Sequence, residues 1–259
     1  MKEKIQYNES FSEDVVENRG QDFPLPEDYV WVESGLLSRL YSGILYGIAW
    51  VIGAFYCRFG LHASIKNRRV LRAWKKKGYF LYANHTQPVG DVFLPVFANP
   101  TKRIYTIVST ANLGLPVIGR FLPRLGALPI PSNLRQMKQF LQAVDQRVQG
   151  GNSVVVYPEA HVWPYYTKIR PFPATSFRFP VENRTPAFAM TTTYQKRRWG
   201  KKPKLTVYVD GPFWPDGTLA KKEQQKKLRD EVFTCMEQRS QSSTYEYIHY
   251  QKKEEVTNE

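Results

Sequence analysis

Three side chains that could act in acid–base chemistry follow two short apolar runs of the sequence. His85 and Asp91 come soon after YFLYA (79–83), and Glu159 comes soon after SVVVY (153–157). Catalytic groups of α/β proteins lie beyond the carboxyl ends of strands, so the two runs predict neighbouring strands whose ends converge on one site. There His85 would take a proton from a hydroxyl, while Asp91 holds the imidazole and stabilises its cation.

The spacing of His85 and Asp91 sets a condition on the backbone between them. Residues six apart on one helix do not face each other, so the pair requires a loop that turns into a helix, with Asp91 in its first turn. Taken alone, the two residues fit an ordinary polar loop better than a catalytic pair. The surrounding elements therefore decide between the two interpretations.

These elements alternate between strand-like and helix-like patterns. We expect strands over 79–83, 103–108, 153–157, 187–194 and 204–209, and helices over 91–98, 133–149 and 219–239. The second of these helices has Asn133 as its N-cap and Gly150–Gly151 as its end. Such alternation predicts one α/β domain over 78–240, with a mostly parallel sheet and helices on both faces.

The composition limits the class of protein. The chain has 259 residues, 42% of them hydrophobic, which is enough for a sizeable core. Its formal net charge of +14 favours an anionic partner such as a membrane surface, an acidic protein or nucleic acid. The two cysteines, Cys57 and Cys235, form no disulfide or zinc pattern, and the polar start lacks the features of a secretory signal. We therefore expect a cytoplasmic location.

The segments outside the α/β domain differ in character. Residues 1–34 are expected to form a polar, extended leader and residues 241–259 a polar tail. Within 35–77, the eighteen residues 40–57 carry no charge, and as a helix they span about 27 Å, close to the hydrocarbon core of a bilayer. A helix that lies on or crosses the cytoplasmic face of the cell membrane is the favoured interpretation, and a buried core helix is the alternative.

Three basic stretches are candidate binding surfaces. Residues 66–78 fit either a helix facing an anionic leaflet or a solvated surface helix. The aromatic and basic stretches 163–172 and 195–204 could stack on RNA bases, but no nucleic-acid motif accompanies them, and a solvated basic hairpin is the simplest interpretation. We favour an anionic leaflet or an acidic acyl carrier protein as the partner and expect no binding of nucleic acid.

Four blocks of the sequence resemble, in order and spacing, the glycerolipid acyltransferase superfamily, whose best-known members are the 1-acylglycerol-3-phosphate acyltransferases. The resemblance extends over about Leu81 to Thr192. The blocks are NHTQPVGD, NLGLPVIGRFLPRLGALPIP, VVVYPEAHVWPYYTKIRPF and RTPAFAM. The resemblance implies transfer of a fatty acyl group from acyl-CoA or acyl-carrier protein to a lysophospholipid-type hydroxyl in phospholipid biosynthesis, with no further cofactor. By the same resemblance His85 is the general base, Asp91 orients it, and Glu159 positions the acceptor.

The resemblance also implies that no covalent acyl-enzyme is needed, and the residues agree. The chain contains no G-x-S-x-G motif that would supply a serine nucleophile. Neither cysteine lies beside a histidine in the sequence. Direct attack of the acceptor hydroxyl on the thioester is therefore the expected route.

The sequence departs from the family pattern at three points. Five residues separate His85 from Asp91 where the family has four, and two family arginines, expected to hold the acceptor phosphate, are missing from the second and third blocks. Ile130-Pro131-Ser132 stands where the first belongs, and Glu159-Ala160-His161-Val162 replaces E-G-T-R. Other cations are then candidates for the acceptor phosphate, namely Arg120, Arg124, Arg135, Lys168 and Arg170.

Two further alternatives remain at the level of sequence. His161 could complete a metal triad with His85 and Glu159, but the spacing matches no metal motif. We expect no metal, with His161 in a supporting hydrogen-bonding role near the substrate. The departures also leave open an acceptor other than a simple lysophosphatidic acid, and a catalytically silent lipid- or partner-binding module on the same fold.

Overall fold

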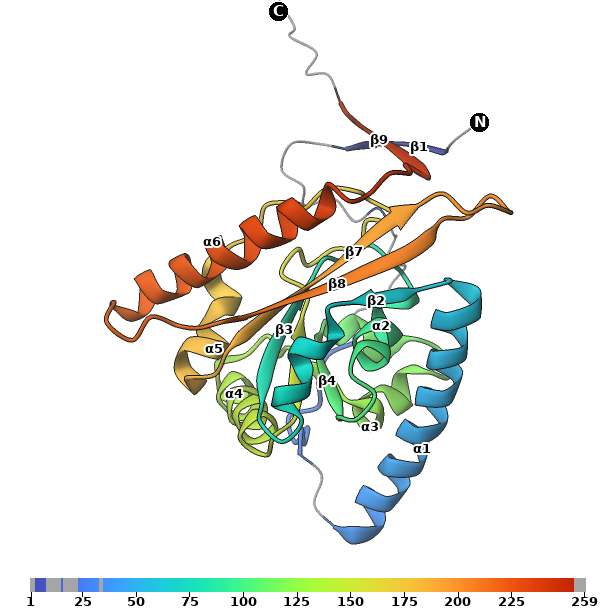
Figure 1. Ribbon diagram of the computed structural model, residues 1–259. Coiled ribbons are helices and arrows are strands. Elements are labelled where there is room, and N and C mark those ends of the chain that lie inside the picture. Colours follow the sequence, from blue (N-terminus) through green and yellow to red (C-terminus); the bar gives the residue numbers. More distant parts are fainter. Residues whose placement is uncertain (1–2, 8–14, 16–22, 33–34, 254–259) are drawn as a thin grey trace, which may run out of the picture.

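A seven-stranded sheet forms the centre of the computed structural model, which describes residues 3–7, 15, 23–32 and 35–253 (Figure 1). Five of the six neighbouring strand pairs are parallel, and only β7 and β8 run antiparallel. This arrangement confirms the mostly parallel sheet predicted from the sequence. In their order across the sheet, the strands are β2 (Ser64–Lys66), β8 (Lys204–Phe213), β7 (Ala187–Gln195), β3 (Tyr79–Ala83), β6 (Ser153–Val156), β4 (Ile104–Val108) and β5 (Ala127–Pro129).

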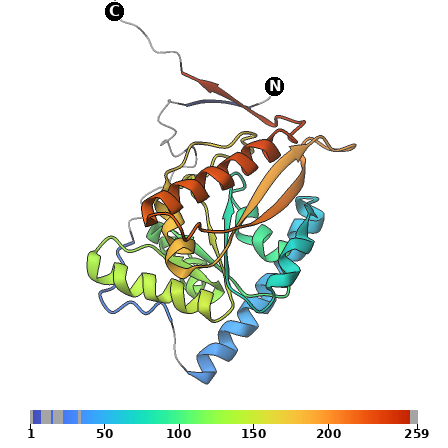
Figure 2. The same cartoon turned by 60° about the vertical axis from the view of Figure 1, so that its left-hand side comes forward.

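Helices cover both faces of the sheet and create two cores (Figures 1 and 2). Side chains alternate between the faces along β3: Phe80 and Tyr82 join one core, while Tyr79, Leu81 and Ala83 join the other. The first core packs against α4 (Leu134–Gln149), η5 (Ala174–Phe177), α5 (Arg178–Asn183) and α6 (Lys221–Ser240). The second packs against α2 (Gly90–Ala98), the π-helical turn η1 (Tyr56–Gly60) and the 3-10 helix η2 (Arg68–Trp74).

Three short helical segments connect β4 to β5, and two of them carry the candidate cations Arg120 and Arg124. They are η3 (Thr110–Gly114), η4 (Gly119–Phe121) and α3 (Leu122–Leu125). Neither this cluster nor the three-residue strands β2 and β5 was expected from the sequence. Elements of three to five residues are too short to show a periodic pattern.

Helix α1 (Leu36–Phe55) lies along one side of the molecule and continues into η1 (Figure 1). It begins four residues earlier than the uncharged stretch expected from the sequence. It is the only helix of the described ranges that is long and apolar enough to cross a membrane, and 11% of its most apolar stretch is buried. The alternative of a buried core helix is therefore wrong. Its exposed apolar side chains are Leu36, Leu37, Leu40, Tyr41, Ile44, Ile48, Val51, Ile52 and Phe55.

The expected leader and tail contain structure that the sequence did not predict. Strand β1 (Glu3–Tyr7) pairs in parallel with β9 (Ile248–Lys252), so the two ends of the chain form a separate two-stranded ribbon. Trp31 is buried in the main core, and its indole N–H donates to the Pro129 carbonyl at 2.9 Å. The other parts of the predicted leader and tail, at 1–2, 8–14, 16–22, 33–34 and 254–259, lie outside the described residues.

Candidate active site

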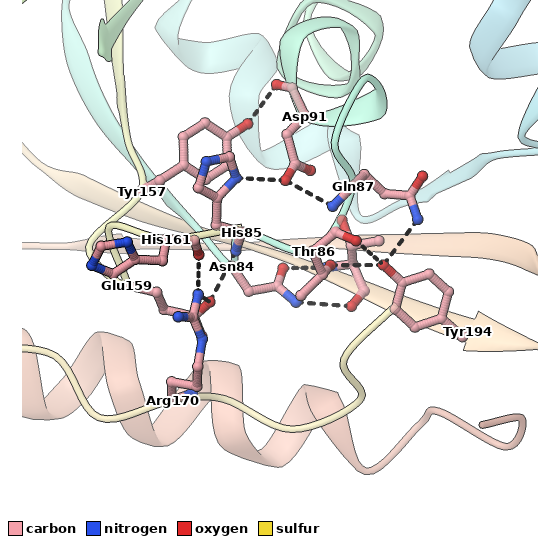
Figure 3. A network of polar contacts seen from close by, with 11 residues as sticks. Asn84, His85, Thr86, Gln87, Asp91, Tyr157, Glu159, His161, Arg170 and Tyr194 are labelled. Atoms are coloured by element: carbon pink, nitrogen blue, oxygen red, sulfur yellow. Dashed lines mark hydrogen bonds and ion pairs between the residues drawn. The ribbon is translucent and has the colours of Figure 1, made fainter. Parts of the chain in front are cut away.

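His85 and Asp91 meet at the carboxyl end of β3, as the sequence predicts. The distance between His85 Nδ1 and Asp91 Oδ2 is 2.8 Å, and Asp91 lies in the first turn of α2 (Figure 3). Asp91 is 3% exposed, whereas the imidazole is 20% exposed. A carboxylate at Nδ1 fixes the tautomer in which Nε2 carries a lone pair, so the open nitrogen of His85 is equipped to accept a proton.

The extra residue between His85 and Asp91 is accommodated in an exposed turn. Pro88 and Val89 form this turn outside the core, and Gly90 then starts α2. Gln87 closes the turn, because its backbone N–H donates to Asp91 Oδ2 at 2.9 Å and its carbonyl accepts from the Asp91 N–H. A Cβ at Gly90 would lie 2.9 Å from side-chain atoms of Gln87 and Leu61. The five-residue spacing therefore leaves the His–Asp contact intact.

Strand β7 holds the loop that carries His85 from the other side. The Asn84 side chain makes two hydrogen bonds to the Thr192 backbone, at 2.8 and 3.1 Å. The Tyr194 hydroxyl donates to Thr86 and accepts from Gln87. These buried bonds fix the backbone on both sides of His85. In the sequence, Asn84, Thr86 and Gln87 stand out only as members of the NHTQPVGD block. Tyr194 gives no local signal, since it is an isolated polar residue on a strand.

Tyr157, at the end of β6, contacts both members of the pair. Its ring stacks on the His85 imidazole, with centroids 4.3 Å apart, and its hydroxyl donates to the Asp91 carbonyl at 2.5 Å (Figure 3). Burial of the hydroxyl, with the nearby charge of Asp91, raises the pKa of Tyr157 well above its ordinary value. Tyr157 therefore stays protonated and keeps this bond at neutral pH. From the sequence, this tyrosine is expected only as the last residue of a strand.

The Tyr157→Phe variant tests this positioning role. Phenylalanine keeps the stacked ring but loses one hydrogen bond, so we expect kcat to fall up to about tenfold with the acceptor KM unchanged. Tyr157→Leu removes the ring as well and should lower kcat further. Steady-state kinetics distinguish the steps, and full activity in the leucine variant would contradict the role.

Glu159 and Arg170 form a buried ion pair beneath His85. Arg170 Nη2 lies 3.0 Å from Glu159 Oε2, and the backbone N–H of Arg170 donates to Glu159 Oε1 at 2.9 Å. Glu159 Oε2 also accepts from the backbone N–H of His85 at 3.0 Å, and Arg170 Nη2 donates to the His161 carbonyl. The Arg170 side chain is 1% exposed. The two side chains thus bind each other inside the protein, and Glu159 also holds the backbone of His85, a geometry that favours a positioning role over the contact with acceptor expected from the sequence.

Ala160 adopts a backbone conformation that favours glycine. Its φ is 64°, and it stands where the family's E-G-T-R block has Gly. An L side chain in this left-handed region costs about 1–2 kcal/mol. We therefore expect Ala160→Gly to raise the unfolding free energy by about 1 kcal/mol, measured by denaturant unfolding. Ala73→Gly, at an exposed position of η2 with ordinary φ, is the control and should destabilise; a similar loss at 160 would count against the strain.

The remaining predicted residues are dispersed. His161 is partly exposed beside Glu159 (Figure 3), and the described residues contain no group of His, Cys, Asp and Glu that could hold a metal. Arg120 and Arg124 lie on η4 and α3, next to β5, and the Arg124 guanidinium is 5.5 Å from the Tyr41 ring of α1. Two exposed cations lie elsewhere, Arg135 on the first turn of α4 and Lys168 on the loop before Arg170.

The two cysteines are poorly suited to nucleophilic catalysis. Burial raises the pKa of Cys57 to about 12. Burial and the charge of Asp210 raise the pKa of Cys235 to about 11, against the opposing effect of Arg239. Since the thiolate is the reactive form, both thiols are inert at neutral pH.

Comparisons with known proteins identify the family and the fold. A model of the acyltransferase family matches residues 62–193, slightly more than half of the chain. The crystal structure of the 1-acyl-sn-glycerophosphate (LPA) acyltransferase PlsC from Thermotoga maritima is similar in fold, with a TM-score of 0.54 and 15% identity over 81% of this chain and 97% of that one. No curated protein matches the sequence.

The chain belongs to the acyltransferase family, and the class of enzyme is that of the O-acyltransferases. The resemblance to the glycerolipid acyltransferase superfamily is thereby confirmed, together with the α/β fold.

Proposed function

We propose that the protein transfers a fatty acyl group from acyl-CoA or acyl-carrier protein to the hydroxyl of a lysophospholipid-type acceptor, such as 1-acylglycerol-3-phosphate. The observation that carries the proposal is the His85–Asp91 contact of 2.8 Å at the rim of the sheet. The similar fold of an LPA acyltransferase supports the choice of acceptor. A silent binding module would have no need of a buried carboxylate held against the imidazole.

The proposed reaction is a direct transfer. Nε2 of His85 accepts the proton of the acceptor hydroxyl while the hydroxyl oxygen attacks the thioester carbonyl. Asp91 stabilises the imidazolium that forms. The C–S bond then breaks, and the imidazolium returns its proton to the departing thiolate. The new ester and the free thiol account for every atom, with no covalent acyl-enzyme.

Acceptor binding would draw on cations other than Arg170. The candidates for the acceptor phosphate remain Arg120, Arg124, Arg135 and Lys168. His161 would line the rim of the sheet that holds His85 and Asp91. We assign Glu159 and Arg170 to positioning His85, because Arg170 Nη2 pairs with the Glu159 carboxylate in the interior and that carboxylate accepts from the backbone N–H of His85.

Lipid substrates would reach the site from a membrane at the cytoplasmic face. The apolar side chains of α1 are exposed, and α1 packs on α2 where the Phe93 ring lies against Gly53. Val89 and Val92, on either side of Asp91 at the start of α2, are more than half exposed. An apolar surface that continues to the first turn of the catalytic helix suits a bilayer as the source of acyl chains. An anionic leaflet and an acidic carrier protein both match the net charge of the chain.

The direct test is thiol release from palmitoyl-CoA and from palmitoyl-carrier protein, with a panel of lysolipid acceptors. We expect release that depends on the acceptor and on His85, with His85→Ala as the control. The preferred pair identifies donor and acceptor together. Release with no acceptor at all would indicate a thioesterase, and no release with any pair would favour the silent binding module.

A further inference from the structure

The connection between β7 and β8 is a basic hairpin tip that projects from the body of the protein (Figures 1 and 2). The last paired residues of the two strands are Gln195 and Lys204. Residues 196–204, which we call the basic tip, contain six cations and no acid. All of these cations are exposed except Arg197, which is partly buried, and the Trp199 side chain is 79% exposed. A large aromatic ring in this setting contributes nothing to the core.

The basic tip is fastened to the end of the apolar helix. The Arg197 guanidinium donates to the Pro203 carbonyl inside the tip and to the Gly60 carbonyl at the end of η1, both at 2.9 Å. Phe59, one residue before Gly60, is 58% exposed, and its ring lies 4.7 Å from that of exposed Phe55. The basic tip therefore adjoins the exposed apolar surface of α1.

The charges around this junction are of one sign. The sequence has no acidic residue between Glu33 and Asp91 or between Glu182 and Asp210, the two stretches that supply α1, η1 and the basic tip. Among the ion pairs of the described residues, none includes a cation of the tip. The cations are thus exposed without an internal partner charge, which is the condition for attraction to an external anion.

We propose that the basic tip binds the headgroups of an anionic membrane leaflet, with Trp199 at the lipid–water interface, as a second anchor beside α1. This inference rests on the proposed function only in placing the enzyme at a membrane. An acidic carrier protein would match the cations, but the exposed Trp199 and the continuity with the apolar face of α1 favour a bilayer. A tip fixed to the end of α1 holds the sheet at a set orientation to the leaflet.

The test compares two full-length variants that lose the same number of charges. In the tip variant Lys196, Arg198, Lys201 and Lys202 become Gln, while Arg197 is kept because it ties the tip to Gly60. In the control variant Lys138, Lys221, Lys222 and Lys226 become Gln; these lysines are exposed on α4 and at the beginning of α6. Co-sedimentation is measured with phosphatidylcholine vesicles that contain or lack phosphatidylglycerol.

We expect the tip variant to bind the phosphatidylglycerol vesicles on the order of a hundredfold more weakly than wild type, with little change for the control variant. Trp199→Ala should weaken binding to both kinds of vesicle several-fold. Equal losses in the two charge variants would overturn the proposal, because binding would then follow net charge alone. Unchanged vesicle binding with lost binding to acyl carrier protein or RNA would overturn it in favour of that partner. Thiol release by wild type from a soluble short-chain thioester tests the proposed reaction separately.

Discussion

The His85→Ala variant is expected to lose about three orders of magnitude in kcat, because it removes the only general base of the proposed reaction. Asp91→Asn should lose nearly as much. An amide at this position no longer stabilises the imidazolium, and its N–H₂ group can hold His85 in the wrong tautomer. Acceptor-dependent thiol release under saturating donor measures both losses.

The double variant His85→Ala/Asp91→Asn makes this prediction sharper. Residues that act as one unit show strongly non-additive losses, so the double variant should be no slower than His85→Ala alone. If the two residues contributed independently, the losses in kcat of the single variants would instead multiply in the double variant. Unfolding curves are the control for folding, since Asp91 is buried and also accepts from the Gln87 N–H. Multiplying losses in a folded protein would contradict the dyad.

The positions of the main strands could be predicted from the sequence because they are buried on both faces. Strand 79–83 is continuously apolar, and strand 153–156 is apolar after Ser153, so their ends directly locate His85 and Glu159. The helix 134–149 could likewise be bounded by its cap, where the Asn133 side chain accepts from the Gln136 N–H at 2.8 Å. Local patterns of this kind need no knowledge of the rest of the chain.

Other features depend on contacts that no local pattern encodes. The ribbon of β1 and β9 joins two segments more than 200 residues apart, and each one has only two alternating apolar residues, which is too few to predict a strand. Tyr157 looks like the last residue of a buried strand until the fold brings His85 beneath its ring. The sequence makes Arg170 a candidate for the acceptor phosphate, because it shows the charge of this side chain but not its burial.

Loss of the Glu159–Arg170 pair is expected to have the largest effect on stability. Arg170→Met leaves the Glu159 carboxylate buried without its counter-charge, which should lower the unfolding free energy by about 3–5 kcal/mol. Arg178→Met breaks the exposed pair with Glu182 and is the matched control, with an expected loss of at most about 0.5 kcal/mol. Denaturant unfolding with a common m-value measures both.

The double variant Glu159→Leu/Arg170→Met separates stability from catalysis. Two apolar side chains can replace a buried ion pair with little loss, so we expect most of the stability to return. Activity should stay low, because the backbone N–H of His85 then loses its acceptor, the Glu159 carboxylate 3.0 Å away. If Arg170 instead held the acceptor phosphate, Arg170→Met would raise the acceptor KM at nearly unchanged stability. Recovery of stability without recovery of kcat would identify the pair as the support of the general base.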